Sequence, residues 1–129
     1  MRTPHPETWL RTTPAGLHCL PGGFHIDPVR PVERAVITHG HADHARPGHG
    51  AVLATPETLA IMRARLGEER AGGQLQPIRY GERLVQDGVR IWLRPAGHVL
   101  GSAQICLEWQ GSRVVVSGDY KRRRDPTCA

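Results

Sequence analysis

Four side chains that can bind a metal ion occur within six consecutive positions of this sequence. The run HGHADH contains His39, His41, Asp43 and His44. Neutral imidazole nitrogens and carboxylate oxygens are ligands that zinc, manganese and iron accept. Two histidines separated by one residue can direct both rings to one ion, and the Asp-His pair that follows can serve a second ion. The spacing therefore favours a metal centre over a surface loop that is rich in histidine by chance.

Two further candidate ligands follow predicted strands later in the chain. His98 comes after Pro95-Ala96-Gly97, and Asp119 comes after Ser117-Gly118. Small residues beside a ligand let the backbone approach an ion closely. Alone, His98 would be interpreted as a core or surface histidine, and Asp119 as a turn residue. Because three predicted strands end in such residues, we expect the ends to converge on one site.

The elements that must position these ligands follow from local patterns. Residues 35–38 (AVIT) form a β-branched run typical of a buried strand, and this run leads directly into HGHADH. Thr55 can cap a helix that begins at Pro56, with Leu59 and Met62 at helical spacing and Gly67 as its end. The ligand loop therefore lies between a strand and a helix.

Short strands separated by turns account for most of the remaining chain. Strands are predicted at residues 17–20 and 24–26 around a Pro-Gly-Gly turn, at 83–86 and 89–93 around Asp87-Gly88, and at 105–109 and 114–117 around Gly111-Ser112. Hairpins imply antiparallel pairs. The order of strands, ligand loop, helix and further strands predicts an α/β fold with a mixed β-sheet and a flanking helix.

The composition is that of a globular protein with a basic charge. The chain has 129 residues and a formal net charge of +5, and Lys121 is its only lysine. No apolar run is long enough to span a membrane and no signal peptide is recognisable, so we expect a cytoplasmic protein with no membrane partner. The three cysteines, Cys19, Cys106 and Cys128, have no spacing typical of a disulfide framework or a zinc site, and we expect buried small hydrophobic residues.

One cluster of positive charge follows the last candidate ligand. Lys121, Arg122, Arg123 and Arg124 are consecutive. Such a run can guide a phosphate backbone toward a metal site, and it can equally be a solvated polar face. We call residues 39–44 (HGHADH) the metal loop, and His49 in RPGHG lies close to it in sequence. One interpretation of His49 is a substrate contact, and the favoured one is a solvated loop histidine.

Several motifs together resemble one enzyme superfamily. ITHGHADH, AGHVLG and SGDY are similar to motifs of the metallo-β-lactamase superfamily, and AGHVLG with SGDYK resembles its nucleic-acid-processing β-CASP branch. That branch includes cleavage and polyadenylation factors and DNA-repair nucleases. FHIDPVRPV, HADHARPGHG and PAGHVLGSAQ make the chain most similar to bacterial ligase-associated DNA exonucleases, also labelled mRNA 3′-end processing factors.

The resemblance implies a fold and a role for each ligand. The fold would be the N-terminal part of an αββα sandwich. His39, His41 and His98 would hold one divalent ion, Asp43 and His44 the other, and Asp119 would bridge the two. The ions would be Zn²⁺, with Mn²⁺ as the alternative. Asp27 matches a family aspartate that supports the ligand loop without binding the metal.

Hydrolysis by a hydroxide held between two metal ions is the chemistry that this sequence supports. Asp43 and Asp119 would hold the ions and accept hydrogen bonds from the hydroxide. The leading function is a phosphodiesterase acting on DNA, as an exonuclease in DNA repair or end processing, with RNA as the other nucleic acid. Two alternatives stay open: hydrolysis of a small ester, thioester or lactone, and a non-catalytic fragment that binds metal or nucleic acid.

The resemblance also implies that residues 1–129 are one part of a larger domain. Family members continue with the rest of the fold, a β-CASP insertion and a final histidine ligand. We therefore expect residues 1–129 alone to be inactive. A DNA ligase or a helicase is the partner that the resemblance implies.

Overall fold

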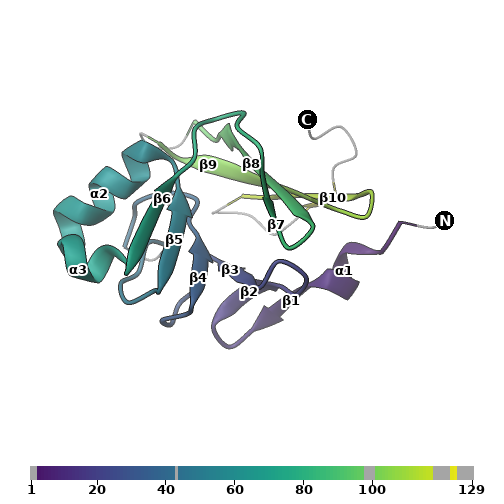
Figure 1. Cartoon of the computed structure of the whole chain (residues 1–129), viewed down its shortest axis with the longest axis horizontal. Helices are drawn as coiled ribbons and strands as arrows, with labels where there is room; N and C mark the ends of the chain where they lie inside the picture. Colours follow the sequence, from purple (N-terminus) through teal and green to yellow (C-terminus); the bar gives the residue numbers. More distant parts are fainter. Residues whose placement is uncertain (1–2, 43, 98–100, 118–122, 125–129) are drawn as a thin grey trace.

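The strands of this protein form two sheets (Figure 1). The computed structural model describes residues 3–42, 44–97 and 101–117, together with the backbone of Arg123 and Arg124. The strands are β1 (Leu10–Thr13), β2 (Gly16–Cys19), β3 (Phe24–Ile26), β4 (Arg34–Val36), β5 (Ala51–Ala54), β6 (Gln74–Pro77), β7 (Leu84–Gln86), β8 (Val89–Pro95), β9 (Ala103–Trp109), β10 (Ser112–Val116) and β11 (Arg123–Arg124). The helices are α1 (Pro6–Trp9), α2 (Pro56–Leu66) and α3 (Glu68–Ala71).

The first sheet is mixed and has the order β1-β2-β3-β4-β5-β6. β1, β2 and β3 pair in antiparallel fashion, whereas β3, β4, β5 and β6 run parallel to one another. The carboxyl ends of parallel strands meet at the same edge of a sheet, which is where α/β proteins place their sites. The predicted α/β fold with a mixed sheet is therefore confirmed, and the loop that contains the candidate ligands leaves this edge after β4.

The second sheet is antiparallel, with the order β11-β10-β9-β8-β7. The turn predicted at Asp87-Gly88 is confirmed, with φ values of +49° and +85° that match a type I′ hairpin. The second hairpin turns at Gln110-Gly111, because Trp109 pairs with Ser112 and both intervening residues have positive φ. The turn predicted at Gly111-Ser112 was therefore wrong by one residue.

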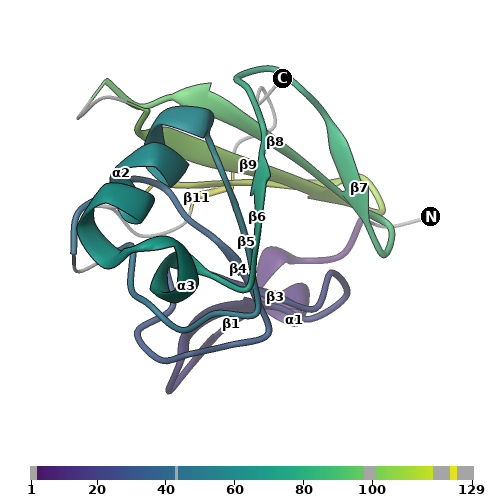
Figure 2. The same cartoon turned by 60° about the vertical axis from the view of Figure 1, so that its left-hand side comes forward.

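Successive residues of β4 and β5 face two different cores. Val36 and Leu53 pack with Ile91, Ile105 and other residues of the second sheet. Their neighbours Ala35 and Val52 pack with α2 instead, since side chains alternate between the faces of a strand. The first sheet accordingly lies between the second sheet and the helices α2 and α3 (Figure 2). This layering buries both faces of β4, the strand that precedes the metal loop.

Helix α2 forms as its sequence predicts. The Thr55 hydroxyl accepts a hydrogen bond from the backbone N–H of Thr58 at 3.2 Å, and Pro56 occupies the first turn. Gly67 ends the helix with φ +85°. Leu59 and Met62 are buried against the sheet. The predicted cap, first residue and end of this helix are all confirmed.

Elements with weak local signals were not predicted. These are α1, α3, β1, β5, β6 and β11. None of the helices in the described part of the chain has the length and apolarity needed to cross a membrane.

Cys19 and Cys106 are buried, as expected, and burial raises the pKa of the Cys19 thiol to about 11. Cys128 lies outside the described residues.

Candidate metal centre

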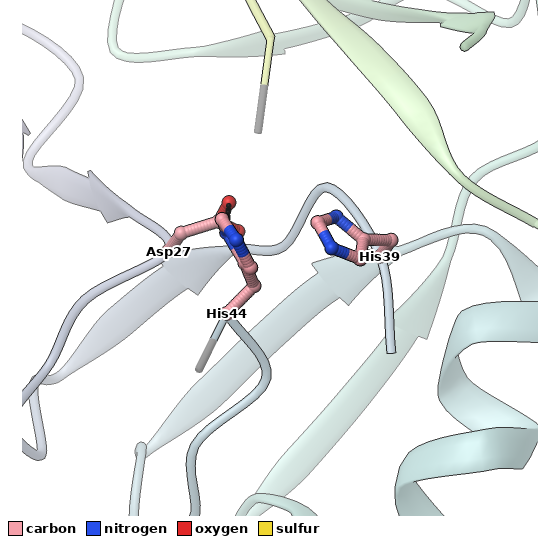
Figure 3. Close-up of side chains that lie close together, drawn as sticks. All are labelled: Asp27, His39 and His44. Atoms are coloured by element: carbon pink, nitrogen blue, oxygen red, sulfur yellow. Dashed lines mark hydrogen bonds and ion pairs between the residues drawn. The ribbon is translucent and has the colours of Figure 1, made fainter. Parts of the chain in front are cut away.

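Three side chains from two neighbouring strand ends gather at the carboxyl edge of the first sheet (Figure 3). Asp27 directly follows β3, while His39 and His44 belong to the loop after β4. Each offers one ligand atom, and these atoms all lie within 4.8 Å of one another. His39 is buried and the other two are partly buried. These residues can therefore reach a common small ligand.

Asp27 connects the end of β3 to the start of the metal loop. Its Oδ1 accepts a hydrogen bond from the Thr38 backbone N–H at 2.8 Å, and its Oδ2 accepts one from the Thr38 hydroxyl at 2.5 Å. The Nδ1 atom of His44 lies 2.9 Å from the same Oδ2. Asp27 adopts a left-handed conformation with φ +44°, which aspartate tolerates better than most residues. That turn of the backbone carries the carboxylate toward the loop.

The hydrogen bonds around Asp27 determine where the histidine protons lie. An ionised carboxylate only accepts hydrogen bonds, so the Thr38 hydroxyl donates its one proton to Asp27. The Thr38 oxygen must then accept from His39, whose Nδ1 lies 2.9 Å away. His44 donates from Nδ1 to Asp27 for the same reason. Both neutral rings therefore have their lone pair on Nε2.

This arrangement fits a divalent metal ion. Neutral histidine binds a metal through a nitrogen lone pair, and the second ring nitrogen of a metal-binding histidine usually donates to a carboxylate or another oxygen. His39 and His44 both meet this condition, and their ring centroids are only 4.1 Å apart. The ring of His41 is 4.9 Å from that of His39, edge to face, but His41 lies outside the group of three. The predicted division of these histidines between two ions stays a prediction.

Comparison with known proteins decides the family. The sequence profile described as "Metallo-beta-lactamase superfamily" matches residues 24–127, which include the metal loop and Asp27. The chain belongs to the metallo-beta-lactamase superfamily. The predicted resemblance and the predicted fold class are thereby confirmed.

Relatives of this superfamily member have names that refer to nucleic acids. A probable DNA ligase from Opitutus terrae is 37% identical over 110 residues, covering 84% of this chain and 10% of that protein. A ribonuclease from Thermus thermophilus is 32% identical over 123 residues, covering 78% of this chain and 28% of that protein. The chain thus spans between a tenth and about a quarter of these relatives. They support the predicted nucleic-acid-processing branch of the superfamily.

A solved structure shares the fold. A protein of unknown function from Enterococcus faecalis superposes with a TM-score of 0.54 at 14% identity, covering 68% of this chain and 25% of that chain. This similarity concerns the fold alone.

Helix α2 holds the metal loop in place from the side. A Cβ atom on Gly40 would lie 2.6 Å from Cγ2 of Ile61, so only glycine lets the loop approach the helix this closely. The Arg65 guanidinium donates to the carbonyl oxygen of Ala45 at 2.6 Å. Both contacts come from α2, so this helix packs against the loop that contains the histidine motif.

A second set of contacts holds the backbone just after residue 100. The carbonyl oxygen of Gly101 accepts hydrogen bonds from the hydroxyls of Thr55 and Thr58 at 2.7 and 3.1 Å. The backbone N–H of Ala103 donates to the carbonyl of Thr38 at 2.7 Å, which ties the start of β9 to the metal loop. The sequence pattern did not predict a function for the Thr58 hydroxyl. The available signal was the pair of threonines three residues apart at the start of a helix.

Replacing these two threonines by valine should destabilise the protein to different extents. Thr58→Val removes one of two hydrogen bonds to a buried carbonyl, so a loss of about 1 kcal/mol in the free energy of unfolding is expected. Thr55→Val also removes the helix cap, and a loss of roughly 2 kcal/mol is expected. Urea denaturation measures both. Thr12→Val, at an exposed position of β1, is the control, and equal midpoints for all three variants would contradict this interpretation.

His49 is a structural residue, which corrects the sequence-based interpretation. Its side chain is 2% exposed, and its Nδ1 accepts a hydrogen bond from the backbone N–H of Val32 at 3.2 Å. The adjacent Gly50 packs so tightly that a Cβ atom would lie 2.7 Å from the carbonyl oxygen of Glu33. The expectation of a solvated loop histidine was therefore wrong, because the RPGHG loop folds back onto the segment before β4.

The burial of His49 predicts a loss of stability in acid. Burial first, and the nearby His25 second, lower the pKa of His49 below 6.5. Below that pH the unfolded chain takes up a proton that the folded chain resists, so stability falls as the pH drops below 6.5 and is constant in this respect above it. The expected result is a lower urea midpoint for metal-free protein at about pH 5.5 than at about pH 7.5.

A matched variant isolates this effect from other titrating groups. His49→Asn keeps an acceptor near the Val32 N–H but cannot bind a proton in this range. The difference between the two pH values should be smaller in this variant than in the unaltered protein. An unchanged difference would assign the acid sensitivity to other groups.

Several predicted site residues lie outside the described residues. These are Asp43, His98, Asp119, Lys121 and Arg122. The backbone of Arg123 and Arg124 forms β11, which pairs with Val115 and Val114 of β10. The structure therefore places the backbone of these two arginines at the edge of the second sheet, while the roles of all these residues stay predictions.

Proposed function

We propose that this chain carries the first part of the active site of a metal-dependent nuclease. The observation that supports this most directly is the cluster in which Asp27, His39 and His44 offer ligand atoms within 4.8 Å of one another, with Nδ1 of each ring hydrogen-bonded to Thr38 or Asp27. The nucleic-acid names of the two relatives support a phosphodiester as the bond that is cleaved. DNA is the proposed substrate, since the relative with the higher identity is named as a probable DNA ligase.

The proposed ligands are those that the family resemblance implies. His39, His41 and His98 would hold one divalent ion, Asp43 and His44 a second, and Asp119 would contact both. Divalent ions at such a site lower the pKa of water and stabilise negative charge on phosphate oxygens. Asp27 keeps a proton on Nδ1 of His44, and Thr38 keeps one on Nδ1 of His39. These protons prevent Nδ1 from competing with Nε2 for an ion.

A nuclease assay with matched substrates tests the proposal. The protein is produced from its complete gene and supplied with Zn²⁺ or Mn²⁺. It should shorten end-labelled linear DNA from an end. It should turn over thioesters and lactones much more slowly. Asp43→Ala controls for contaminating nuclease. Metal-dependent thioester or lactone hydrolysis with intact DNA would contradict the proposal, and preferential cleavage of RNA would correct the substrate.

The basic run after Asp119 is proposed to bind the phosphate backbone. Lys121 and Arg122 to Arg124 supply four consecutive positive charges, and each phosphate that they neutralise contributes to the salt dependence of binding. Replacing Arg122, Arg123 and Arg124 by alanine should reduce the slope of log affinity against log salt by about 0.7–0.9 for each phosphate that is no longer neutralised. Fluorescence anisotropy across a salt series measures this slope. An unchanged slope would indicate a solvated face.

A ligase is the proposed partner activity. A segment similar to 84% of this chain occurs within a protein named as a probable DNA ligase, of which it makes up 10%. Segments fused in one protein commonly act on a common substrate. A nuclease acting before a ligase would prepare the DNA ends that the ligase joins. Co-purification of this protein with a ligase from its own cells tests this proposal. The co-purified signal should disappear when the gene for either protein is deleted.

A further inference from the structure

A hollow lies at the same edge of the sheet as the metal loop. Its volume is about 440 Å³, and it is lined by Pro56, Glu57, Arg79, Tyr80 and Gly101. Pro56 and Glu57 follow β5, and Arg79 and Tyr80 follow β6, so both pairs leave the carboxyl edge of the parallel strands. The volume is within the range of small-ligand pockets, about 300–1,000 Å³.

The spacing of the strands gives the approximate distance between this hollow and the candidate metal centre. The metal loop follows β4, and β6 is two strands away in the same sheet. Neighbouring strands are about 4.8 Å apart, so the ends of β4 and β6 are separated by roughly 10 Å. Gly101 lines the hollow, and Ala103, the first residue of β9, donates its backbone N–H to the carbonyl of Thr38. A nucleic-acid strand at the metal centre can reach the hollow within a few nucleotides.

Tyr80 presents an aromatic ring with a defined orientation. Its hydroxyl donates a hydrogen bond to the carbonyl oxygen of Ser102 at 2.8 Å, which restrains the ring, while the residue is 40% exposed. Desolvation and the nearby Glu57 raise the pKa of Tyr80, so the ring stays neutral at physiological pH. A neutral, restrained and accessible ring is the surface on which nucleic-acid-binding proteins stack bases.

The charged groups of the hollow have no ionic partner in the described part of the chain. The Glu57 carboxylate and the Arg79 guanidinium form no ion pair with each other or with another described residue. A carboxylate accepts hydrogen bonds from the exocyclic amino groups of cytosine, adenine and guanine, which thymine and uracil lack. A guanidinium binds phosphate oxygens. One nucleotide offers partners for both groups.

We propose that this hollow is a subsite for one nucleobase that carries an exocyclic amino group. Tyr80 stacks on the base, Glu57 accepts from its amino group, and Arg79 contacts the phosphate of the same nucleotide. The inference rests on the proposed function in one respect: it assumes that the strand in the subsite continues to the metal centre.

Fluorescence binding measures the subsite without requiring catalysis. Single-stranded oligonucleotides with 2-aminopurine at successive positions are titrated into protein kept in chelator, so that nothing is cleaved. One position should show a strong quenching of fluorescence from stacking. Tyr80→Leu should abolish that quenching and weaken binding about 5–100-fold, whereas Tyr80→Phe should retain the quenching because the ring is kept. Val85→Ala, at an exposed position of β7, is the matched control for surface substitution.

Base preference tests the role of Glu57. Oligonucleotides with cytosine or thymine at the quenched position should differ in affinity in favour of cytosine. Glu57→Gln supplies both a donor and an acceptor, so it should reduce or reverse that preference while leaving the quenching by Tyr80 in place. Equal affinity for cytosine and thymine in the unaltered protein would overturn the assignment of Glu57.

The outcomes separate this inference from the proposed function. Metal-dependent cleavage with unchanged binding, quenching and KM in Tyr80→Leu would overturn the subsite and leave the nuclease proposal intact. Quenching that depends on Tyr80 in a protein without metal-dependent cleavage would support the subsite and contradict the nuclease proposal. An equal loss of binding in Tyr80→Leu and Tyr80→Phe would assign Tyr80 a structural role through Ser102, and would overturn stacking.

Discussion

Replacing His39 or His44 by alanine is expected to remove metal-dependent hydrolysis to the level of an assay without enzyme. Each substitution deletes one of the two imidazoles of the proposed metal centre, which are hydrogen-bonded to Thr38 and Asp27. Elemental analysis should show a lower metal content per chain in both variants, and activity should not return when metal is added in moderate excess.

The control for this experiment is a histidine of the same sheet that lies outside the metal group. His18 pairs with His25 across β2 and β3, and their rings are stacked with centroids 4.4 Å apart. His18→Ala should keep its metal content and its activity. Thermal unfolding of all three variants separates a lost ligand from a lost fold. Full activity in either His39→Ala or His44→Ala would contradict the assignment of the site.

Replacing Asp27 by asparagine is expected to weaken metal binding by about 10–100-fold. Asparagine has nearly the shape of aspartate, but its NH₂ group is a donor and it carries no charge. The asparagine side chain can therefore no longer accept hydrogen bonds from Thr38 and His44 with both of its terminal atoms. His44 then loses the partner that keeps its proton on Nδ1. Competition with a chromogenic chelator measures the affinity.

A second variant separates the two branches of the network. Thr38→Val removes the hydroxyl that receives the proton of His39, but leaves the contact between Asp27 and His44 in place. Thr38→Val should weaken metal binding through His39 alone. The double variant Thr38→Val with Asp27→Asn should lose less free energy of metal binding than the sum of the losses in the two single variants, because the residues act in one network. Metal affinity equal to that of the unaltered protein in Asp27→Asn would show that the carboxylate has no supporting role.

The elements predicted correctly from the sequence are those that local chemistry determines. A type I′ hairpin needs two residues that accept positive φ, and Asp87-Gly88 satisfies this within two positions. Helix α2 likewise has its cap, its first residue and its end within the predicted segment. The one-residue error at Gln110-Gly111 arose because glutamine is rarely found at positive φ, and only the pairing of Trp109 with Ser112 defines the turn.

Two of the missed strands, β5 and β6, depend on parallel partners that are not adjacent in the sequence. β6 contains Gln74, Gln76 and Pro77, a composition that does not predict a strand, and it forms because its backbone pairs in parallel with β5. β5 has only four residues, which is too short for a periodicity to be recognised. Parallel pairing joins segments separated by a whole helix, so no local window contains the evidence for it.

The types of chemistry at the site were determined by the sequence alone, because metal-binding groups are a property of residue type and HGHADH contains four of them. The tertiary structure decided how those groups are used. It placed Asp27 beside Thr38 and His44, which are 11 and 17 residues away, and so determined which nitrogen of each ring carries a proton. It also buried His49, which had been expected in solvent. Proton positions and burial depend on contacts between distant segments, and these contacts exist only once the sheets have formed.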